Sequence, residues 1–254
     1  MIDQPLFYLA AIPAVFVTGV SKGGFGGAVA FVSVPTMALF VAPLTAAAIM
    51  LPILLAMDAI SMKVYWRKWA VDHLKILVPA SLIGTALGTF TASYVNDAVF
   101  RILLAALAII FALNLLKNMY LTKSMATAGG ETKSWLGWVL GTIAGYSSFF
   151  AHAGGPPLNA YLLPKRLEKT MFQATFVFVF TALNLSKIGP YIWLNELHWE
   201  TFSTAMVLTP WAIFSIYAGV WLHKRVSEKP FYLLCCIGML ATGIKLAVDG
   251  LSAF

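Results

Sequence analysis

Six long apolar segments constrain this chain more than any other feature. They cover residues 44–62, 76–95, 99–116, 171–193, 201–222 and 231–248. Each holds roughly 18 to 23 residues, about 27 to 35 Å as a helix, which matches a hydrocarbon core of about 30 Å. Only 11% of the residues are charged, whereas soluble domains average about 25%. The sequence therefore predicts an all-α protein that crosses a membrane many times.

Two further regions contain shorter apolar segments, each interrupted by a glycine-rich stretch. In the first, segments 6–19 and 28–41 flank Ser21-Lys22-Gly23-Gly24-Phe25-Gly26-Gly27. In the second, segments 135–146 and 156–164 flank residues 147–155, which end in Gly154-Gly155. Short, broken apolar segments at matching places of two halves are typical of the discontinuous helices of transporters. We therefore expect two broken helical hairpins, 6–41 and 135–164.

The basic residues predict a topology for these segments. Thirteen of the 17 lysines and arginines fall in four clusters: Lys63, Arg67, Lys68 and Lys75; Lys117, Lys123 and Lys133; Lys165, Arg166 and Lys169; Lys224, Arg225 and Lys229. The connections at 96–97 and 195–200 are neutral or acidic. The positive-inside rule places the four clusters in the cytoplasm. Hairpin 6–41 then enters and returns on the outer side, hairpin 135–164 does so on the cytoplasmic side, and both termini lie outside.

A weak internal similarity agrees with this opposite orientation. Three pairs of residues stand at matching places of the two halves: Pro79 and Pro210, Gly88 and Gly219, and Asp58 and Asn184. We expect residues 1–120 and 135–254 to form two inverted repeats, joined by a cytoplasmic linker at 121–134. Each repeat would consist of one broken hairpin and three transmembrane helices.

The two glycine-rich breaks are the candidate binding site. Each break leads into an apolar segment, and Pro156 and Pro157 suit the first turn of a helix. A helix N-terminus presents free N–H groups and a partial positive charge, which favour an anion, and glycine allows a ligand close to the backbone. The alternative is that these glycines only let two hairpins pack tightly.

Among the basic residues outside the four clusters, Lys22 is the hardest to place at a membrane surface. Arg101 and Lys245 each have an aspartate four positions away and lie near a predicted membrane surface. Lys187 lies about four turns into its helix and either reaches the outer surface or stays inside. A lysine within the membrane is costly and by default functional. We therefore expect Lys22 to be a countercharge to the anion, unless the first hairpin is shallow and Lys22 meets water.

Two groups of candidate site residues follow. The candidate substrate-binding residues are those of the two breaks and the helix after the second: Ser21, Lys22, Gly23, Gly24, Gly26, Gly27, His152, Gly154, Gly155 and Asn159. The candidate gating or proton-coupling residues are Asp58, Asn184 and Lys187. Asp58 either pairs with Lys22, carries a proton or caps a neighbouring helix, and His152 either donates to an oxyanion or is a packing residue.

Two motifs resemble the TauE/SafE family of membrane proteins, also called the toluene sulfonate uptake permeases. The first is GVSKGGFGG at 19–27, with VP at 34–35 and LPIL at 51–54 after it. The second is AHAGGPP at 151–157, followed by YLLP at 161–164. The resemblance covers nearly the whole chain. It implies transport of sulfite, sulfoacetate or other organosulfonates, often as export across a bacterial inner membrane.

The sequence favours a secondary transporter that binds a small anion between the breaks and works by alternating access. It contains no Walker-type phosphate loop, metalloprotease histidine pair or Gly-x-Ser-x-Gly elbow, so we expect no catalytic residue, metal site or cofactor. The formal charge of +7 lies in loops beside apolar segments, which indicates a bilayer rather than a nucleic acid as partner. The alternatives are an anion channel, or a membrane-embedded enzyme or assembly factor that uses His152 and Asp58. The oligomeric state stays open.

Overall fold

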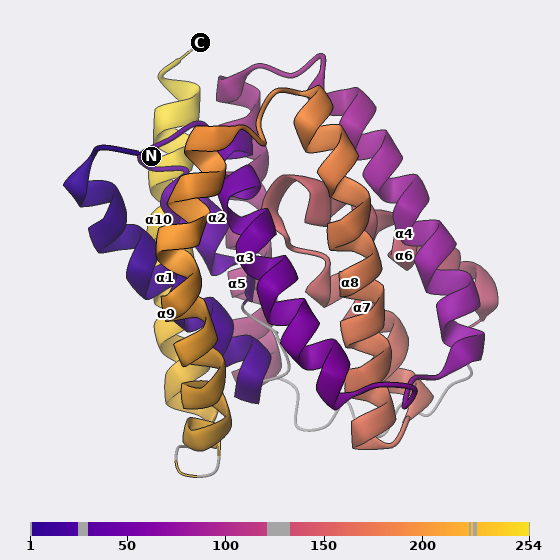
Figure 1. The fold of residues 1–254 in the computed structure, drawn as a ribbon. Coiled ribbons are helices and arrows are strands. Elements are labelled where there is room, and N and C mark those ends of the chain that lie inside the picture. Colours follow the sequence, from indigo (N-terminus) through magenta and orange to yellow (C-terminus); the bar gives the residue numbers. More distant parts are fainter. Residues whose placement is uncertain (1, 25–29, 121–132, 224, 226–227, 254) are drawn as a thin grey trace.

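The computed structural model describes residues 2–24, 30–120, 133–223, 225 and 228–253, and all regular structure in these ranges is helical (Figure 1). The first half contains α1 Pro5–Gly24, a 3₁₀ turn Ala30–Val32, α2 Ser33–Met37, α3 Pro43–Val64, α4 Val71–Ala92 and α5 Asp97–Tyr120. The second half contains α6 Ser134–Ala151, α7 Gly155–Leu162, a 3₁₀ turn Leu163–Lys165, α8 Lys169–Trp193, α9 Trp199–His223 and α10 Glu228–Leu251.

Seven helices in the described ranges are long and apolar enough to cross a membrane: α1, α3, α4, α5, α8, α9 and α10. This confirms the prediction of an all-helical protein with many membrane spans. The six long apolar segments correspond to α3, α4, α5, α8, α9 and α10. Helix α4 begins five residues before the predicted start, at Val71. Asp72 in its first turn suits the positive end of the helix, and the N–H of Ala70 donates to Thr175 Oγ1 at 2.9 Å.

The first break differs from the expectation. The sequence predicts that segment 6–19 ends before Ser21, but α1 continues to Gly24 and is the seventh candidate span. The reason is packing against α9: a Cβ on Gly23 would lie 2.3 Å from the carbonyl oxygen of Ile216. Part of the glycine-rich stretch therefore allows two helices to approach closely. The return segment, expected at 28–41, contains only the 3₁₀ turn and the short α2, and Gly26 and Gly27 lie outside the described residues.

The second break lies closer to the expectation. Helix α6 runs to Ala151 instead of 146, and α7 begins at Gly155 with Pro156 and Pro157 in its first turn. Between them His152 has a φ of 51°, in the left-handed region. Its N–H donates to the carbonyl oxygen of Ser148 at 3.0 Å, so the turn satisfies the end of α6. The chain reverses here within three residues.

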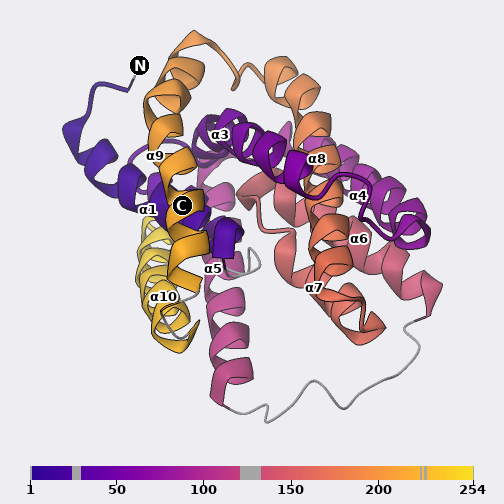
Figure 2. The ribbon, with the colours of Figure 1, turned by 60° about the horizontal axis from the view of Figure 1, so that its bottom comes forward.

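The most extensive helix contacts keep their pattern when α1–α5 are exchanged with α6–α10, whereas the contacts of α2 with α3 and of α3 with α5 have no counterpart of similar extent in the second half. Helix α1 packs on α9, and α6 packs on α4. Helix α3 contacts α9 in the way that α8 contacts α4, while α3 contacts α8 and α5 contacts α10. Figures 1 and 2 show α3 and α8 between two groups, with α1, α9, α10 and α5 on one side and α4 and α6 on the other. Each half thus contributes helices to both groups.

Glycines allow the closest of these contacts. A Cβ on Gly145 of α6 would lie 1.9 Å from the carbonyl oxygen of Ser81 on α4. On the other side, a Cβ on Gly219 of α9 would lie 2.5 Å from the carbonyl oxygen of Val20 on α1. The α4–α6 and α1–α9 pairs therefore approach backbone to backbone, as small residues permit in membrane bundles.

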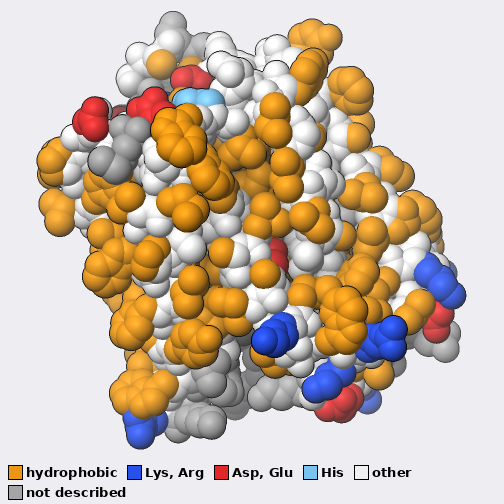
Figure 3. Space-filling view, viewed as in Figure 1, with side chains coloured by type: hydrophobic (Ala, Val, Ile, Leu, Met, Phe, Trp, Pro, Cys, Tyr) orange, Lys and Arg blue, Asp and Glu red, His pale blue; other side chains and the backbone are white. Residues whose placement is uncertain are grey.

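Charge is distributed unevenly between the two ends of the bundle. Figure 3 shows lysine and arginine side chains gathered at the lower end, and Figure 1 shows both chain ends in the upper part. The upper end includes the loop between α8 and α9, with Glu196 and His198, and the first turn of α9, with Glu200. We refer to the two ends below as the basic end and the acidic end.

Candidate functional site

A buried carboxylate near the centre of the bundle is held by two side chains from other helices. Oδ1 of Asp58, on α3, accepts a hydrogen bond from Lys22 Nζ at 2.5 Å. Oδ2 accepts from Nδ2 of Asn184, on α8, at 2.6 Å. Asp58 and Asn184 are almost fully buried, and the Lys22 side chain is 13% exposed. The two predicted repeat mates, 58 and 184, therefore touch each other where α3 meets α8.

A second lysine extends this cluster into the protein. Lys187 lies one turn beyond Asn184 on α8 and is fully buried. Its Nζ donates to Ser148 Oγ at 2.7 Å and to Asn184 Oδ1 at 3.2 Å, and it lies 2.9 Å from His152 Nδ1. On the other side of the ring, His152 Nε2 lies 2.9 Å from the carbonyl oxygen of Ala47. Lys187 therefore stays inside the protein and does not reach the outer surface.

The proton positions follow if Lys187 is an ammonium group, which has three donors and no acceptor. Nδ1 of His152 then accepts from Lys187, and Nε2–H donates to the carbonyl oxygen of Ala47. The imidazole is then neutral. With both lysines protonated and Asp58 ionised, the cluster carries one positive charge more than it has negative charges. A buried excess of one positive charge is unfavourable on its own and attracts an anion.

A cavity lies beside the cluster. The volume open to the centre of a water molecule is about 30 Å³, and one water needs roughly 10–15 Å³ of such volume, so the cavity has room for about two or three waters. The polar end of the cavity is formed by Lys22, Asp58, His152, Gly155 and Asn184. The rest of the lining consists of Ala30, Phe31, Leu54, Ser61, Gln173, Phe176, Val177 and Phe180.

The cavity passes the cluster, reaching Leu54 one turn before Asp58 on α3, and extends toward the basic end. Its α3 residues run from Leu54 to Ser61, three residues before the helix ends at Val64. Its α8 residues run from Asn184 back to Gln173, four residues after the helix begins at Lys169. Both helix ends adjoin the basic clusters seen in Figure 3.

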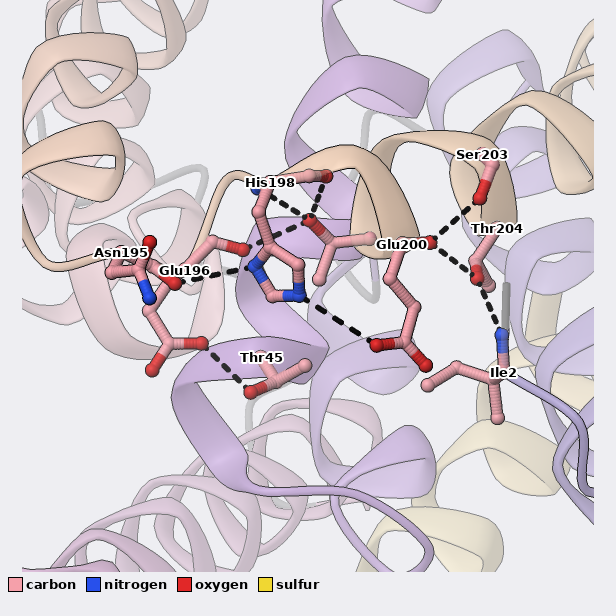
Figure 4. Close-up of polar contacts among 9 residues, drawn as sticks. Ile2, Thr45, Asn195, Glu196, His198, Glu200, Ser203 and Thr204 are labelled. Atoms are coloured by element: carbon pink, nitrogen blue, oxygen red, sulfur yellow. Dashed lines mark hydrogen bonds and ion pairs between the residues drawn. The ribbon is translucent and has the colours of Figure 1, made fainter.

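Toward the acidic end, polar and aromatic contacts cover the cluster. The hydroxyl of Tyr191 donates to the carbonyl oxygen of Phe149 at 2.5 Å, and the two rings meet edge to face at 5.2 Å. Both side chains are fully buried. Closer to the end, Thr45 Oγ1 on α3 donates to Glu196 Oε2 in the α8–α9 loop at 2.7 Å (Figure 4). The Tyr191–Phe149 contact lies within the second half, and the Thr45–Glu196 contact joins the first half to the second.

The structure brings six of the 13 predicted site residues together at the cavity. Lys22, His152, Gly155, Asp58 and Asn184 line the cavity, Lys187 lies behind them, and Gly154 precedes α7. Other predicted residues lie elsewhere. Ser21 is buried within α1, Gly23 faces α9, and Asn159 lies on α7, outside the described lining of the cavity.

Several residues of the site are not predicted by the sequence. Ser148 holds Lys187 in place of its neighbour Ser147, and two adjacent serines at the break give no signal that separates them. In the sequence, Phe176 and Phe180 look like part of an ordinary apolar span. Their spacing places them on the same helical face as Gln173 and Asn184, and this shared face is a signal that could have identified them as site residues. Arg101 does not pair with Asp97 as its spacing suggests. It donates to the carbonyl oxygen of Ala38 at 2.8 Å and so caps the end of α2.

Among the described residues, no group of three or more His, Cys, Asp or Glu side chains is placed to hold a metal ion. The cluster offers hydrogen-bond donors and positive charge, which suit the binding of an anion. The chemistry that this arrangement can supply is therefore recognition of charge.

Comparisons with known proteins give one match. A family model described as "Sulfite exporter TauE/SafE" matches residues 11–246. Searches of curated proteins and of solved structures found no match. The matched range includes both breaks, the buried cluster and every residue that lines the cavity.

Proposed function

The chain belongs to the sulfite exporter TauE/SafE family, and on that premise we propose that it is a secondary transporter that exports a small sulfur-containing anion such as sulfite, sulfoacetate or another organosulfonate. As a member of this family it is a multi-pass membrane transporter and not an enzyme. The site of the anion, the direction and the mechanism are parts of our proposal.

One observation carries the proposed site: the buried cluster has two lysines and only one carboxylate. An anion in the cavity beside Lys22 would bring the net charge of the site to zero. Two unit charges 4 Å apart attract by about 4 kcal/mol at an effective dielectric constant of 20. Lys22 then exchanges part of its contact with Asp58 for the ligand, while Asn184, which itself accepts from Lys187, holds the carboxylate in place.

The backbone at the second break supports the same site. Helix α7 begins at Gly155, which lines the cavity, and prolines occupy the next two positions. The N–H of Gly155 is one of the donors that a helix leaves unpaired at its start. We propose that this N–H and the ammonium of Lys22 approach the anion from two sides.

The helix pairing supports alternating access. The exchange of α1–α5 with α6–α10 preserves the most extensive helix contacts, and positions 58 and 184 meet where α3 crosses α8. Both features support two inverted repeats related by an axis near Asp58 and Asn184. We propose that the described arrangement opens toward the basic end, and that the opposite state requires the Tyr191–Phe149 and Thr45–Glu196 contacts to separate.

The basic end faces the cytoplasm in this proposal, and both termini lie outside a bacterial inner membrane. The cytoplasm is electrically negative, so outward movement of one negative charge is favoured by about 2.3 kcal/mol per 100 mV. Export of the anion therefore needs no ATP. The membrane potential alone is a sufficient driving force.

Flux from liposomes tests the proposal. Purified protein is reconstituted, the vesicles are loaded with sulfite or ethanesulfonate, and efflux is followed with and without an imposed potential. The matched variants are Lys22→Ala, within the site, and Lys245→Ala, in an exposed pair with Asp249 at 2.9 Å. We expect Lys22→Ala to lower the initial rate at least about 100-fold, as loss of roughly 3 kcal/mol predicts. Lys245→Ala should stay within about twofold. Equal rates for the two variants would refute the role of Lys22.

A further inference from the structure

The cavity wall of aromatic side chains is not explained by the binding of an inorganic anion. We propose, building on the transport function above, that Phe176 and Phe180 determine specificity, and that the preferred substrate is an organic anion with a short apolar group next to its charged head. Sulfite itself is then a poorer ligand for this chain.

The lining of the cavity separates into two regions. The charged and polar groups Lys22, Asp58, His152 and Asn184 lie at one end. Beside them, the walls are formed by Phe31, Leu54, Phe176, Val177 and Phe180. The remaining polar side chains of the described lining, Ser61 and Gln173, lie nearer the basic end. A ligand that fits has a negative head and an apolar body.

A small inorganic oxyanion does not match these walls. All of its oxygen atoms are hydrated in water, and each one that faces an aromatic ring loses a hydrogen bond without replacement. An alkyl or aryl group on the anion reverses this effect, because its burial against the same rings is favourable. The apolar wall therefore discriminates between two ligands with the same charged head.

The aromatic wall is also held in position by its own packing. Phe176 and Phe180 lie one turn apart on α8 with their ring centroids 4.8 Å apart, and Phe172 stacks on Phe176 at 6.0 Å. Across the cavity, Phe31 packs edge to face on Phe111 of α5 at 5.1 Å. Rings fixed in this way select by shape, since they do not turn aside to make room for hydration water.

Competition between anions of increasing length provides the test. Efflux is measured from proteoliposomes in the presence of sulfite, methanesulfonate, ethanesulfonate or butanesulfonate, and the apparent affinity of each anion is determined. We expect affinity to rise about fourfold for each added methylene until the cavity is filled. The variant Phe180→Ala should weaken the affinity for butanesulfonate about tenfold more than the affinity for sulfite, whereas Phe180→Leu, which keeps an apolar wall, should retain most of the preference for butanesulfonate.

Phe178 supplies the matched control. It lies on the same helix but packs on Trp69 at 4.8 Å, outside the described lining of the cavity. Phe178→Ala should leave the ratio of the affinities for sulfite and butanesulfonate unchanged. A flat affinity across the series would overturn the specificity role, as would an equal loss of sulfite and butanesulfonate affinity in Phe180→Ala. Absence of flux for every anion in the unmodified protein would instead refute the transporter on which the inference rests.

Discussion

Removal of the charge on Asp58 should destabilise the protein more than the loss of any exposed ion pair. Asp58→Asn preserves the shape of the side chain and leaves one oxygen to accept a hydrogen bond. It leaves Lys22 and Lys187 without an anion in a buried cluster, where Asp58 is 1% exposed. Breaking one side of a buried ion pair costs about 3–5 kcal/mol. For a chain of this size that cost lowers the melting temperature by about 6–20 °C.

A second variant separates charge from shape. Lys22→Met combined with Asp58→Asn removes one cation and one anion, so the net charge of the cluster stays at +1. Replacing both partners of a buried pair is often close to neutral. The double variant should therefore melt several degrees above Asp58→Asn alone, which is a favourable coupling between the two sites.

Thermal unfolding of the detergent-purified protein measures both effects. The control is Asp249→Asn, which breaks the exposed pair with Lys245 and should shift the melting temperature by less than about 4 °C, because such pairs contribute at most about 1 kcal/mol. The electrostatic reasoning would be refuted if the double variant melted below Asp58→Asn. It would also be refuted if Asp58→Asn and Asp249→Asn behaved alike.

Two further predictions concern packing and closure. Gly145→Ala should lower the melting temperature by several degrees. Its Cβ would lie 1.9 Å from the carbonyl oxygen of Ser81, and overpacking costs about 1–3 kcal/mol. The control Gly238→Ala, whose Cβ would have no neighbour within 4 Å, should leave the melting temperature unchanged or raise it slightly. Tyr191→Phe removes the hydrogen bond to Phe149 and should cost about 1–2 kcal/mol. It should also make Phe149→Cys, introduced beneath it, react faster with a membrane-impermeant thiol reagent added from the acidic end; an unchanged labelling rate would contradict closure at Tyr191.

The membrane character and the long helices are predictable because hydrophobic length and helix length are tied by the thickness of the bilayer. The helix ends are less predictable. Residues 71–75 are too polar to count as a span, yet they form the first turn of α4. Asp72 lies at the positive end of this helix, and Thr175 Oγ1 accepts a hydrogen bond from the N–H of Ala70, just before the helix. Local hydrogen bonds of this kind depend on which helix lies alongside, and hydropathy does not record that.

The candidate site is predictable from the sequence where the burial of a charge in the membrane is energetically costly. An intramembrane charge needs a partner, so Lys22 and Asp58 are natural candidates for each other, and the structure pairs them at 2.5 Å. The position of Lys187 does not follow from its place in the helix, because a long side chain can reach the surface or turn inward. Its three partners come from α6, α8 and the turn after α6, and no local pattern brings them together.

The glycines show two roles within one kind of motif. The sequence groups Gly23 with the binding residues, yet the structure packs it against the backbone of α9. Gly155 belongs to the cavity. Both glycines lie in similar runs, and only the neighbouring helix distinguishes a packing glycine from one that exposes backbone to a ligand.

The pairing of α1 with α9 has a consequence for how the protein is made. About 175 residues separate the end of α1 from the start of α9, which is roughly ten to thirty-five seconds of synthesis. During this interval the glycine face of α1 has no partner helix and must be covered by lipid or by the insertion machinery. The Lys22–Asp58 pair, in contrast, is complete once α3 has been made. The most costly charge of the first helix is thus neutralised early, and the final packing of that helix waits for the last quarter of the chain.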